Sequence, residues 1–340
     1  MKFTDISIEL FRNGYCFKVG SEQYADHEGV DAVGRSRSGM LLWRQAESAR
    51  LADALRTGSA NMVSAEIKLA KELAVRAPNY VRAANLSAVP ISVLEFGPGT
   101  TMAFREKTLP LVQGLTTPNS RCILVDNSAA FLEELRREYG ENLHKLALVQ
   151  DDIFSGRRFT HAEETTFMVM FGRTFGNLDA PASFMPPYQD ATLTLRNLAK
   201  AAPSGWLAVS VGSNLDAPAA KAYYEAHPDF QLNVFYRMQA EVWIEGDFDP
   251  TVLHYEADVR GNEEFLQVVH TAIFSRDMAF RMEDVSFKFK KGDRLHLKNS
   301  FCFSANFMRE AAICAGLEPI DLLTDGLGSD LHVFRKRTVF

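Results

Sequence analysis

Residues 91–100 read ISVLEFGPGT, a largely apolar run that carries a carboxylate near its end and continues into two glycines. An apolar run of this length is typical of a strand that is buried on both faces of a parallel sheet. Glycines after such a strand let a ligand lie against the main chain, and the N-terminus of a following helix offers backbone N–H groups. The stretch therefore predicts the first strand of an α/β core and a nucleotide-binding turn directly after it.

Four further strand patterns follow this turn, and helical patterns separate them. The strands are expected at 122–126, 146–150, 165–171 and 205–212, and the helices include 129–139 and 191–201. Strands that alternate with helices connect through right-handed crossovers and give a parallel sheet with helices on both faces. The predicted fold class is therefore α/β, with a doubly wound and mostly parallel sheet.

The alternation stops after Gly212, and a different pattern follows. A helix is expected at 218–226, and strand-like segments are expected at 240–244, 252–259, 264–274 and 285–289. Apolar and polar residues alternate in these segments, which indicates an antiparallel sheet with one solvated face. The sequence therefore predicts a second, α+β lobe.

Both ends of the chain carry patterns of their own. Helical patterning dominates residues 1–86 and is clearest at 40–55 and 64–75, where apolar positions recur three and four residues apart. At the other end, a helix is expected at 305–315 and a closing strand at 331–337. The closing strand is placed to return to the first sheet.

The composition excludes several classes of protein. Hydrophobic residues make up 46% of the chain and charged residues 24%, a balance that supports an ordered globular fold. The net charge of -6 comes without a clustered basic face, so no nucleic-acid partner is expected. No run approaches the roughly 18 apolar residues that cross a bilayer, so no membrane partner is expected either.

Cysteine and histidine spacing argues against a metal site. Cys16, Cys122, Cys302 and Cys314 form no CxxC pair, and the eight histidines form no HExxH motif. Scattered single cysteines are typical of reduced thiols in a cytoplasmic protein. We therefore expect no bound metal and a cytoplasmic location. The expected oligomeric state is a monomer or a homodimer.

Three kinds of nucleotide ligand use a glycine turn of this type. A dinucleotide fingerprint, GxGxxG, needs a third glycine, but Gly97-Pro98-Gly99 is followed by TTM. A phosphate loop of the Walker type needs a Gly-Lys-Ser/Thr ending, which is absent. S-adenosylmethionine lacks phosphate, so its recognition relies on hydrogen-bond acceptors. Because carboxylates accompany this turn and the next two strand ends, the sequence favours S-adenosylmethionine.

These carboxylates follow successive strands, whose ends sheet topology brings to one edge. Glu95 can counter the sulfonium and amino group of the cofactor, and Asp126 can hold both ribose hydroxyls. Asp151 and Asp152 lie where the adenine amino group needs an acceptor. The residues predicted to bind the cofactor are Glu95, Gly97, Gly99, Thr100, Asp126, Asp151, Asp152 and Phe171.

The segment 170–181, MFGRTFGNLDAP, resembles the FLGSTIGNLxP stretch of the histidine-specific methyltransferase family. Three further stretches are similar to motifs of that family in the same order: LEFGPGT at 94–100, EGDFDPTVLHYEA at 245–257 and the segment 291–319. The best-known member of the family makes the trimethylated histidine of ergothioneine biosynthesis. The resemblance covers about 90–319 and implies an S-adenosylmethionine-dependent methyltransferase.

The resemblance also implies a domain organisation. It implies a Rossmann-like class I methyltransferase core, which binds the cofactor, at 62–212 and 301–340. It implies a substrate-binding lobe made from 1–61 and 213–300. The division at Gly212 agrees with the change of pattern at that residue.

Three acceptor-site residues follow from the same resemblance. In the family, the asparagine of the GNL stretch helps bind the amino and carboxylate groups of the amino acid, and it corresponds to Asn177. Gly172 is implied to line the same pocket. Tyr223, in AYYE, corresponds to a tyrosine in the family's AYDD stretch.

Two departures from the family concern the acceptor pocket. The family grips the imidazole of histidine with a glutamate and, two residues later, a serine; Lys298 and Ser300 occupy these positions. An ammonium cannot accept the N–H that a carboxylate accepts. The stretch ANMVSAE at 60–66 also lacks both tyrosines of the family's YYxTRxE motif. We therefore expect an acceptor other than histidine, with Lys298 and Ser300 contacting a carboxylate or carbonyl of another amino acid.

The predicted function is methyl transfer from S-adenosylmethionine to a small molecule of secondary metabolism. The expected acceptor atom is the amino nitrogen of an amino acid or derivative. Two alternatives stay open: an O- or S-methyltransferase of the same fold, and a non-catalytic protein that uses the cofactor site as a scaffold. No catalytic base is assigned, and His254 and His270, on predicted strands, are interpreted as structural.

Overall fold

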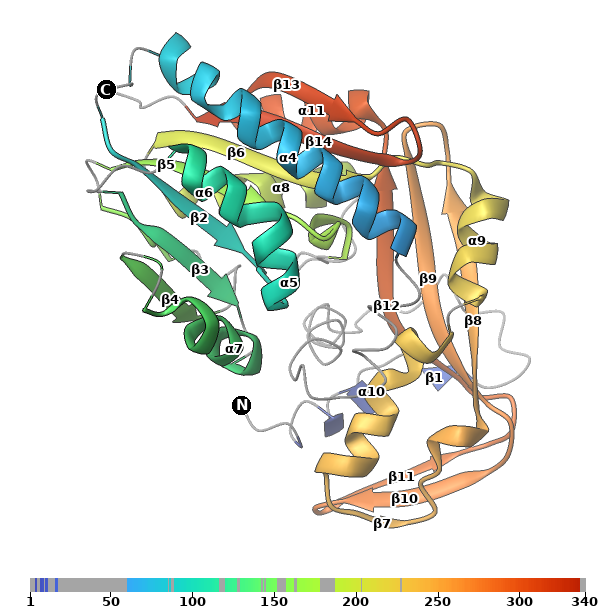
Figure 1. Ribbon diagram of the computed structural model, residues 1–340. Helices are drawn as coiled ribbons and strands as arrows, with labels where there is room; N and C mark the ends of the chain where they lie inside the picture. The colour runs from blue at the N-terminus through green and yellow to red at the C-terminus, as the bar shows by residue number, and fades with distance from the viewer. Residues whose placement is uncertain are drawn as a thin grey trace.

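The computed structural model describes most of the chain from residue 60 onward and a few residues before it (Figure 1). The described residues are 4, 7–8, 10–11, 16–17, 60–84, 86, 89–115, 120–126, 129–141, 143, 145–151, 157–161, 164–177, 187–202, 204–226 and 228–336. The helix expected at 40–55 lies outside them, as does Asp152.

A central sheet of 11 strands runs through the molecule. Its parallel part has the order β4-β3-β2-β5-β6, with the bounds β2 Ile91–Phe96, β3 Cys122–Asp126, β4 Leu146–Gln150, β5 Thr165–Met170 and β6 Ser204–Gly212. Strands β2, β3 and β5 are buried along their whole length, which agrees with their largely apolar sequences. The predicted α/β class and all five predicted strands are confirmed.

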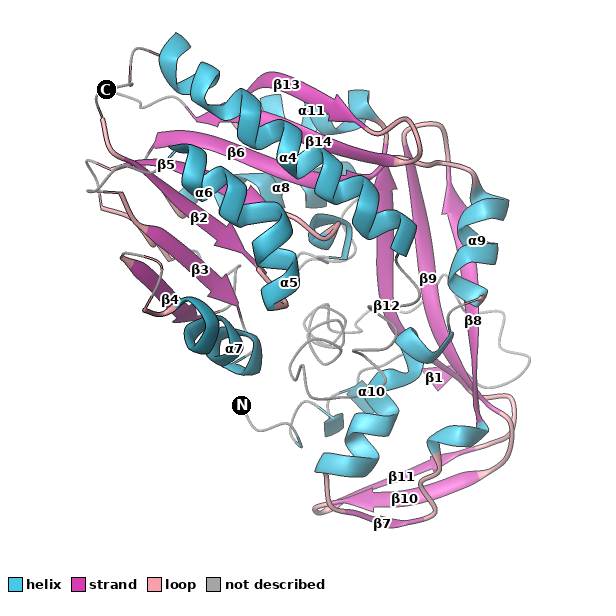
Figure 2. Ribbon diagram, viewed as in Figure 1, coloured by secondary structure: helices cyan, strands magenta, loops and turns pink. Residues whose placement is uncertain are grey.

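Helices cover both faces of this parallel part (Figure 2). On one face lie α4 (Ala60–Ala83), α6 (Leu109–Leu115) and α7 (Ala129–Tyr139), and on the other lie α8 (Pro187–Lys200) and α11 (Ala305–Cys314). Neighbouring residues of β6 serve the two faces, since Trp206 packs on the α4 side and Leu207 on the α8 side. The sheet is therefore doubly wound, as predicted.

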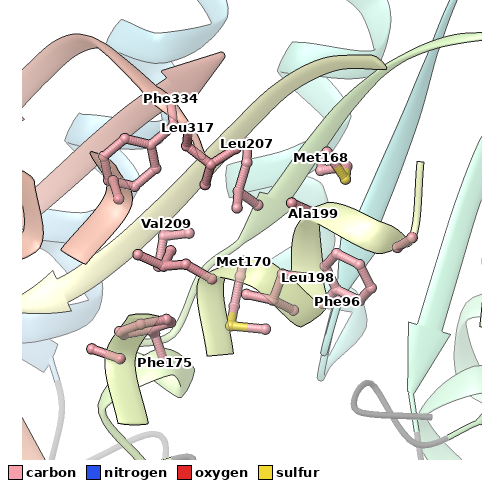
Figure 3. Packing of buried hydrophobic residues seen from close by; sticks show 14 of the residues in the cluster. Phe96, Met168, Met170, Phe175, Leu198, Ala199, Leu207, Val209, Leu317 and Phe334 are labelled. Carbon is pink, nitrogen blue, oxygen red and sulfur yellow. The ribbon is translucent and has the colours of Figure 1, made fainter. Parts of the chain in front are cut away.

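Figure 3 shows the apolar cluster on the α8 side of the sheet. Phe96 from β2, Met168 and Met170 from β5 and Leu198 from α8 are all 0% exposed. Burying a side chain of this kind contributes roughly 1.5–3 kcal/mol. This cluster and its counterpart on the α4 side hold the carboxyl ends of the parallel strands in fixed positions.

Antiparallel strands extend the same sheet beyond β6. They are β12 (Arg294–Phe303), β9 (Phe265–Phe274) and β8 (Leu253–Gly261), and β12 joins β6 in parallel where Cys302 faces Gly212. The strands predicted at 252–259 and 264–274 are confirmed by β8 and β9. The predicted domain limit between residues 300 and 301 falls inside β12, and the domain limits stay a prediction.

The C-terminal strand closes the sheet on the other side of β6. This strand, β14 (Ser329–Lys336), pairs antiparallel with β6 and with β13 (Glu318–Thr324). It confirms the predicted return of the chain to the first sheet. Near the N-terminus, the short strand β1 (Cys16–Phe17) pairs with β12.

A separate three-stranded sheet lies at the bottom of Figure 1. It consists of β7 (Ile244–Gly246), β10 (Met278–Met282) and β11 (Val285–Phe289), and the helix α10 (Pro228–Glu241) packs on it, while η3 (Pro250–Val252) directly precedes β8. Helix α9 (Ala217–Glu225) lies instead along β8 and β9 of the large sheet. Its core is rich in phenylalanine, with Phe235 and Phe280 packed against Phe11 from the N-terminal region. The first residues of the chain and the region after Gly212 therefore share a core.

The strand expected at 240–244 is wrong over most of its length. Residues 240 and 241 end α10, and β7 begins at Ile244. Phe235, Met238 and Val242 recur at helical spacing and are buried in one cluster. An alternation over five residues is too short a signal to compete with that longer apolar face.

A buried histidine on β14 makes the stability of the fold depend on pH. His332 is 3% exposed, and its Nε2 has no hydrogen-bond partner among the described residues. Burial lowers the pKa of His332 from 6.5 to about 4. The pKa of His332 is lower in the folded than in the unfolded protein. His332 therefore costs no stability above pH 6.5, and the free energy of unfolding falls as the pH drops from 6.5 towards 4. The loss at pH 5 is expected to be about 2 kcal/mol.

Replacing His332 with leucine should remove this part of the acid sensitivity. Urea unfolding of wild type and His332→Leu at pH 8 and pH 5 checks the expectation. Between pH 8 and pH 5, the wild type should lose about 2 kcal/mol more unfolding free energy than His332→Leu loses. The exposed His254, replaced with glutamine, is the control. A shift of equal size in both variants would rule out His332 as its source.

Candidate cofactor and acceptor site

The turn after β2 has the backbone form that its glycines allow. Gly97 and Gly99 have φ angles of 69° and 64°, in the left-handed region that favours glycine. The N–H of Gly97 donates to the carbonyl of Val125 in β3 at 2.8 Å, which anchors the turn to the sheet. Thr100 then caps the next helical segment, because its Oγ1 accepts from the Ala103 N–H at 3.2 Å.

The main chain of this turn lies open to a ligand. A Cβ placed on Gly99 would meet no described atom within 4 Å. The helical segment that starts beside it consists of α5 (Thr101–Ala103), the π-helix η1 (Phe104–Thr108) and α6. The turn and the first N–H groups of this segment can therefore cradle a bound molecule.

Glu95, just before the turn, is a buried carboxylate with 1% exposure. Burial raises the pKa of Glu95 to about 7, although the Thr108 hydroxyl and the charge of Lys107 partly oppose this effect. No described donor makes a well-formed hydrogen bond to either oxygen. Because an unpartnered buried acceptor is costly, its presence indicates a ligand that donates hydrogen bonds or carries positive charge. The amino group and sulfonium of S-adenosylmethionine have these properties.

The predicted aspartates lie together at the same sheet edge. Asp126 ends β3 and is buried, and one of its carboxylate oxygens accepts from the Gly99 N–H at 3.4 Å. Asp151 follows β4, and its N–H donates to the carbonyl of Asp126 at 3.1 Å. The Asp151 carboxylate also pairs with Arg157 at 3.3 Å. The structure thus brings Glu95, Asp126, Asp151 and the glycine turn to one place.

The segment after β5 lies opposite the glycine turn. A Cβ on Gly97 would lie 4.0 Å from Cγ2 of Thr174, which belongs to the short helix η2 (Thr174–Asn177). Phe171 precedes this helix, is 1% exposed and belongs to the apolar cluster on the α4 side. Gly172 begins the turn between them with a φ of 81°.

A buried ion pair, which the sequence did not reveal, fixes this segment. Glu66 of α4 accepts hydrogen bonds from the Gly172 N–H and the Ser210 hydroxyl, and it pairs with Lys107 Nζ of η1 at 2.9 Å. Burial opposes ionisation of Glu66, but Lys107 and these hydrogen bonds hold its pKa below the usual value. Lys107 also lies 5.7 Å from the centre of the Phe171 ring. The pair therefore ties α4 and η1 to the loop after β5.

Two predicted acceptor residues from distant parts of the chain meet. Ser300 Oγ of β12 donates to Asn177 Oδ1 of η2 at 2.7 Å, across 123 residues of sequence. Gly176 makes the approach possible, because a Cβ there would clash with the carbonyl of Phe301. Another predicted residue, Tyr223 of α9, lies farther from this pair. Its ring packs edge-on against Tyr224, whose ring in turn packs edge-on against the His270 imidazole.

Lys298 lies inside the protein, with 3% exposure. It is two residues from Ser300 on β12, so both side chains lie on the same face of the sheet. Its cross-strand partner is His270 of β9, which is itself 0% exposed. The buried ammonium and the Asn177–Ser300 pair therefore belong to one region of the molecule.

The described part of the chain lacks two kinds of feature. No group of three or more histidine, cysteine, aspartate or glutamate side chains in this part of the chain could hold a metal ion. None of its helices is long and apolar enough to cross a membrane.

The family model of histidine-specific, S-adenosylmethionine-dependent methyltransferases matches residues 64–333. The chain belongs to this family. It is therefore an S-adenosylmethionine-dependent methyltransferase that acts on a small molecule, and the resemblance found in its motifs is confirmed. The open glycine turn and the buried carboxylate of Glu95 fit S-adenosylmethionine, the cofactor of this family.

Other proteins are similar to this methyltransferase over most of its length. The chain is 48% identical over 302 residues to the uncharacterized protein y4iF of Sinorhizobium fredii, which covers 88% of this chain and 99% of that protein. Solved structures include an S-adenosylmethionine-dependent methyltransferase from Clostridium acetobutylicum, with a TM-score of 0.44, 11% identity, and coverage of 83% and 96%. DesVI of Streptomyces venezuelae has a TM-score of 0.39, 16% identity, and coverage of 85% and 98%.

Proposed function

We propose that this methyltransferase methylates the amino nitrogen of a free amino acid or derivative other than histidine. The observation that carries the proposal is the buried Lys298, which lies two residues from Ser300 on the same face of β12, while Ser300 bonds to Asn177. A cation at this place favours an acceptor with a carboxylate or carbonyl and disfavours one with an imidazole N–H. We also place the reaction in the cytoplasm and in secondary metabolism, with the enzyme a monomer or a homodimer.

The cofactor side of the site is proposed to work through acceptors and main-chain donors. Glu95 would bind the amino group and sulfonium, Asp126 the ribose hydroxyls, and Asp151 or Asp152 the adenine amino group. S-adenosylmethionine supplies a methyl group that is already activated by its sulfonium. The remaining residues proposed for this side are Gly97, Gly99, Thr100 and Phe171.

The acceptor side is proposed to hold the nucleophile in line. Asn177 and Ser300 would bind polar groups of the amino acid, with Gly172 and Tyr223 lining the pocket. Lys298 would neutralise a carboxylate. Holding the nucleophile and the methyl carbon ~3–3.5 Å apart lowers the activation barrier by on the order of 7–11 kcal/mol. Positioning therefore accounts for most of the proposed catalysis.

A screen of free amino acids and their derivatives tests the proposal. The purified protein is incubated with S-adenosylmethionine and each compound, release of S-adenosylhomocysteine is followed, and the product is analysed by mass spectrometry. We expect turnover with an amino acid that gains a methyl group on nitrogen, and none with histidine. A product methylated on oxygen or sulfur, or turnover with histidine, would contradict it.

Replacing Lys298 with glutamate should lower kcat/KM for the native acceptor by about 100-fold, because a carboxylate would then face the acceptor's own carboxylate. In Lys298→Met the charge is lost but not reversed. Its kcat/KM should therefore lie between those of the wild type and Lys298→Glu. Lys291→Glu, an exposed change in the turn before β12, is the control and should leave kinetics unchanged. Thermal unfolding checks that each variant is folded. Unchanged kinetics in folded Lys298→Glu would remove Lys298 from the site.

A further inference from the structure

A chain of hydrogen bonds runs behind the Asn177–Ser300 pair. The hydroxyl of Tyr255 lies 2.6 Å from His270 Nδ1, and His270 Nε2 lies 2.9 Å from Ser300 Oγ. Ser300 Oγ is 2.7 Å from Asn177 Oδ1. The chain thus crosses three adjacent strands, β8, β9 and β12, and ends on the loop after β5.

Counting protons gives this chain a direction. The amide oxygen of Asn177 can only accept, so the single proton of Ser300 is donated to it. Ser300 Oγ must then accept from His270 Nε2–H. A neutral imidazole carries one N–H, so His270 Nδ1 accepts, and the Tyr255 hydroxyl donates to it.

The surroundings of His270 keep it in this form. Burial, helped by the charge of Lys298 and by His296, lowers the pKa of His270 well below its ordinary value. The Tyr224 ring packs edge-on against the imidazole at 4.8 Å, and Tyr255 stacks on it at 5.8 Å. A neutral imidazole with both nitrogens engaged is a poor proton acceptor. It is, however, a rigid hydrogen-bond donor to Ser300.

We propose that His270 and Tyr255 are positioning residues that fix the amide of Asn177 with its oxygen towards Ser300 and its Nδ2 towards the methyl acceptor. Nδ2 makes a long contact of 3.5 Å with the carbonyl of Arg173, and its NH2 group has a second hydrogen that can be donated to a ligand. The acceptor group that docks there must therefore itself accept hydrogen bonds, as a carboxylate oxygen does. This inference rests on the proposed role of Asn177 in binding the acceptor.

The tautomer of His270 can be tested without any acceptor. Nitrogen-15 NMR of the protein labelled at its histidines distinguishes Nε2–H, Nδ1–H and imidazolium forms, and comparison with His270→Gln assigns the signal among the eight histidines. We expect the neutral Nε2–H form throughout pH 6–8, and a mixture of tautomers in Tyr255→Phe. An Nδ1–H tautomer or an imidazolium in the wild type would overturn the proposal.

Kinetics with the acceptor found by the screen tests the consequence. His270→Leu should raise KM for the acceptor about tenfold, with a smaller change in kcat and an unchanged Kd for S-adenosylmethionine. His270→Gln keeps an N–H that can reach Ser300 and an oxygen that can accept from Tyr255, so it should restore most of the loss.

The outcomes separate this inference from the proposed function. If wild type methylates an acceptor and KM is the same in His270→Leu, the positioning role is wrong and the proposed function stands. If wild type binds the cofactor but turns over no amino acid, the proposed function fails and the role of His270 in catalysis fails with it. A fall in cofactor affinity equal to the rise in KM would show a general loss of structure, which also contradicts the proposal.

Discussion

Replacing Glu95 with glutamine is expected to weaken binding of S-adenosylmethionine by about 10- to 100-fold at pH 8, the range of a lost hydrogen bond to a charged group. The same change should make the cofactor-free protein more stable. With its pKa raised from 4.5 to about 7, the buried carboxylate of Glu95 costs on the order of 3 kcal/mol of stability above pH 7. Glutamine has nearly the same shape and carries no charge.

The pH dependence of both effects follows from the raised pKa of Glu95. In the wild type without cofactor, the cost is absent below pH 4.5 and grows as the pH rises towards 7. A cationic ligand binds the ionised carboxylate, so wild-type affinity should be highest above pH 7 and fall by up to about tenfold for each unit below it. Neither dependence should remain in Glu95→Gln.

Calorimetric titration with the cofactor and thermal unfolding without it measure the two effects. Glu106→Gln, at a partly exposed carboxylate on η1, is the control. It should change the cofactor affinity and the stability of the cofactor-free protein only slightly. Equal cofactor affinity of wild type and Glu95→Gln at pH 8 would exclude Glu95 from the cofactor site. A less stable Glu95→Gln protein would show that the carboxylate has a structural partner instead.

Replacing Lys107 with methionine should lower the free energy of unfolding by about 3 kcal/mol or more at pH 8, because Glu66 is left buried without its cation. In the variant the pKa of Glu66 should lie above its unfolded value of 4.5. The cost then appears as the pH rises above 4.5 and is smaller in acid. Urea unfolding at pH 8 and pH 5 measures the difference.

Two further variants make this expectation specific to the buried pair. Lys107→Met combined with Glu66→Gln should recover most of the stability, because glutamine still accepts from Gly172 and Ser210 without a charge. Lys71→Met breaks an exposed pair with Glu106 and should cost less than about 1 kcal/mol. A double variant no more stable than the single one would argue that packing, and not charge, is what Lys107 contributes.

The parallel core could be predicted from the sequence because its strands are buried on both faces. ISVLEF and CILVD have no polar face, so their apolar runs are unambiguous. Strand β12 gave no such signal, since His296, Lys298, Asn299 and Ser300 are all buried in it. Polar residues inside a strand are held by long-range partners, which a local pattern does not contain.

The same contrast applies to the site. The carboxylates near the glycine turn lie at or just after the carboxyl ends of three neighbouring strands, so sheet topology alone places Glu95, Asp126 and Asp151 together. The bond between Ser300 and Asn177 depends on how β12 joins β6, which no short-range pattern specifies. Glu66 and Lys107 were detectable in part, as charged residues on otherwise apolar helix faces, but nothing in the sequence shows that they pair.

Strand β12 carries Lys298 and Ser300 and belongs to the same sheet as β2, which leads into the glycine turn. The proposed cofactor site and the proposed acceptor site thus share one continuous sheet. In such an arrangement evolution can exchange the molecule that is methylated by changing side chains along a single strand. The spacing that the transfer requires would be inherited unchanged.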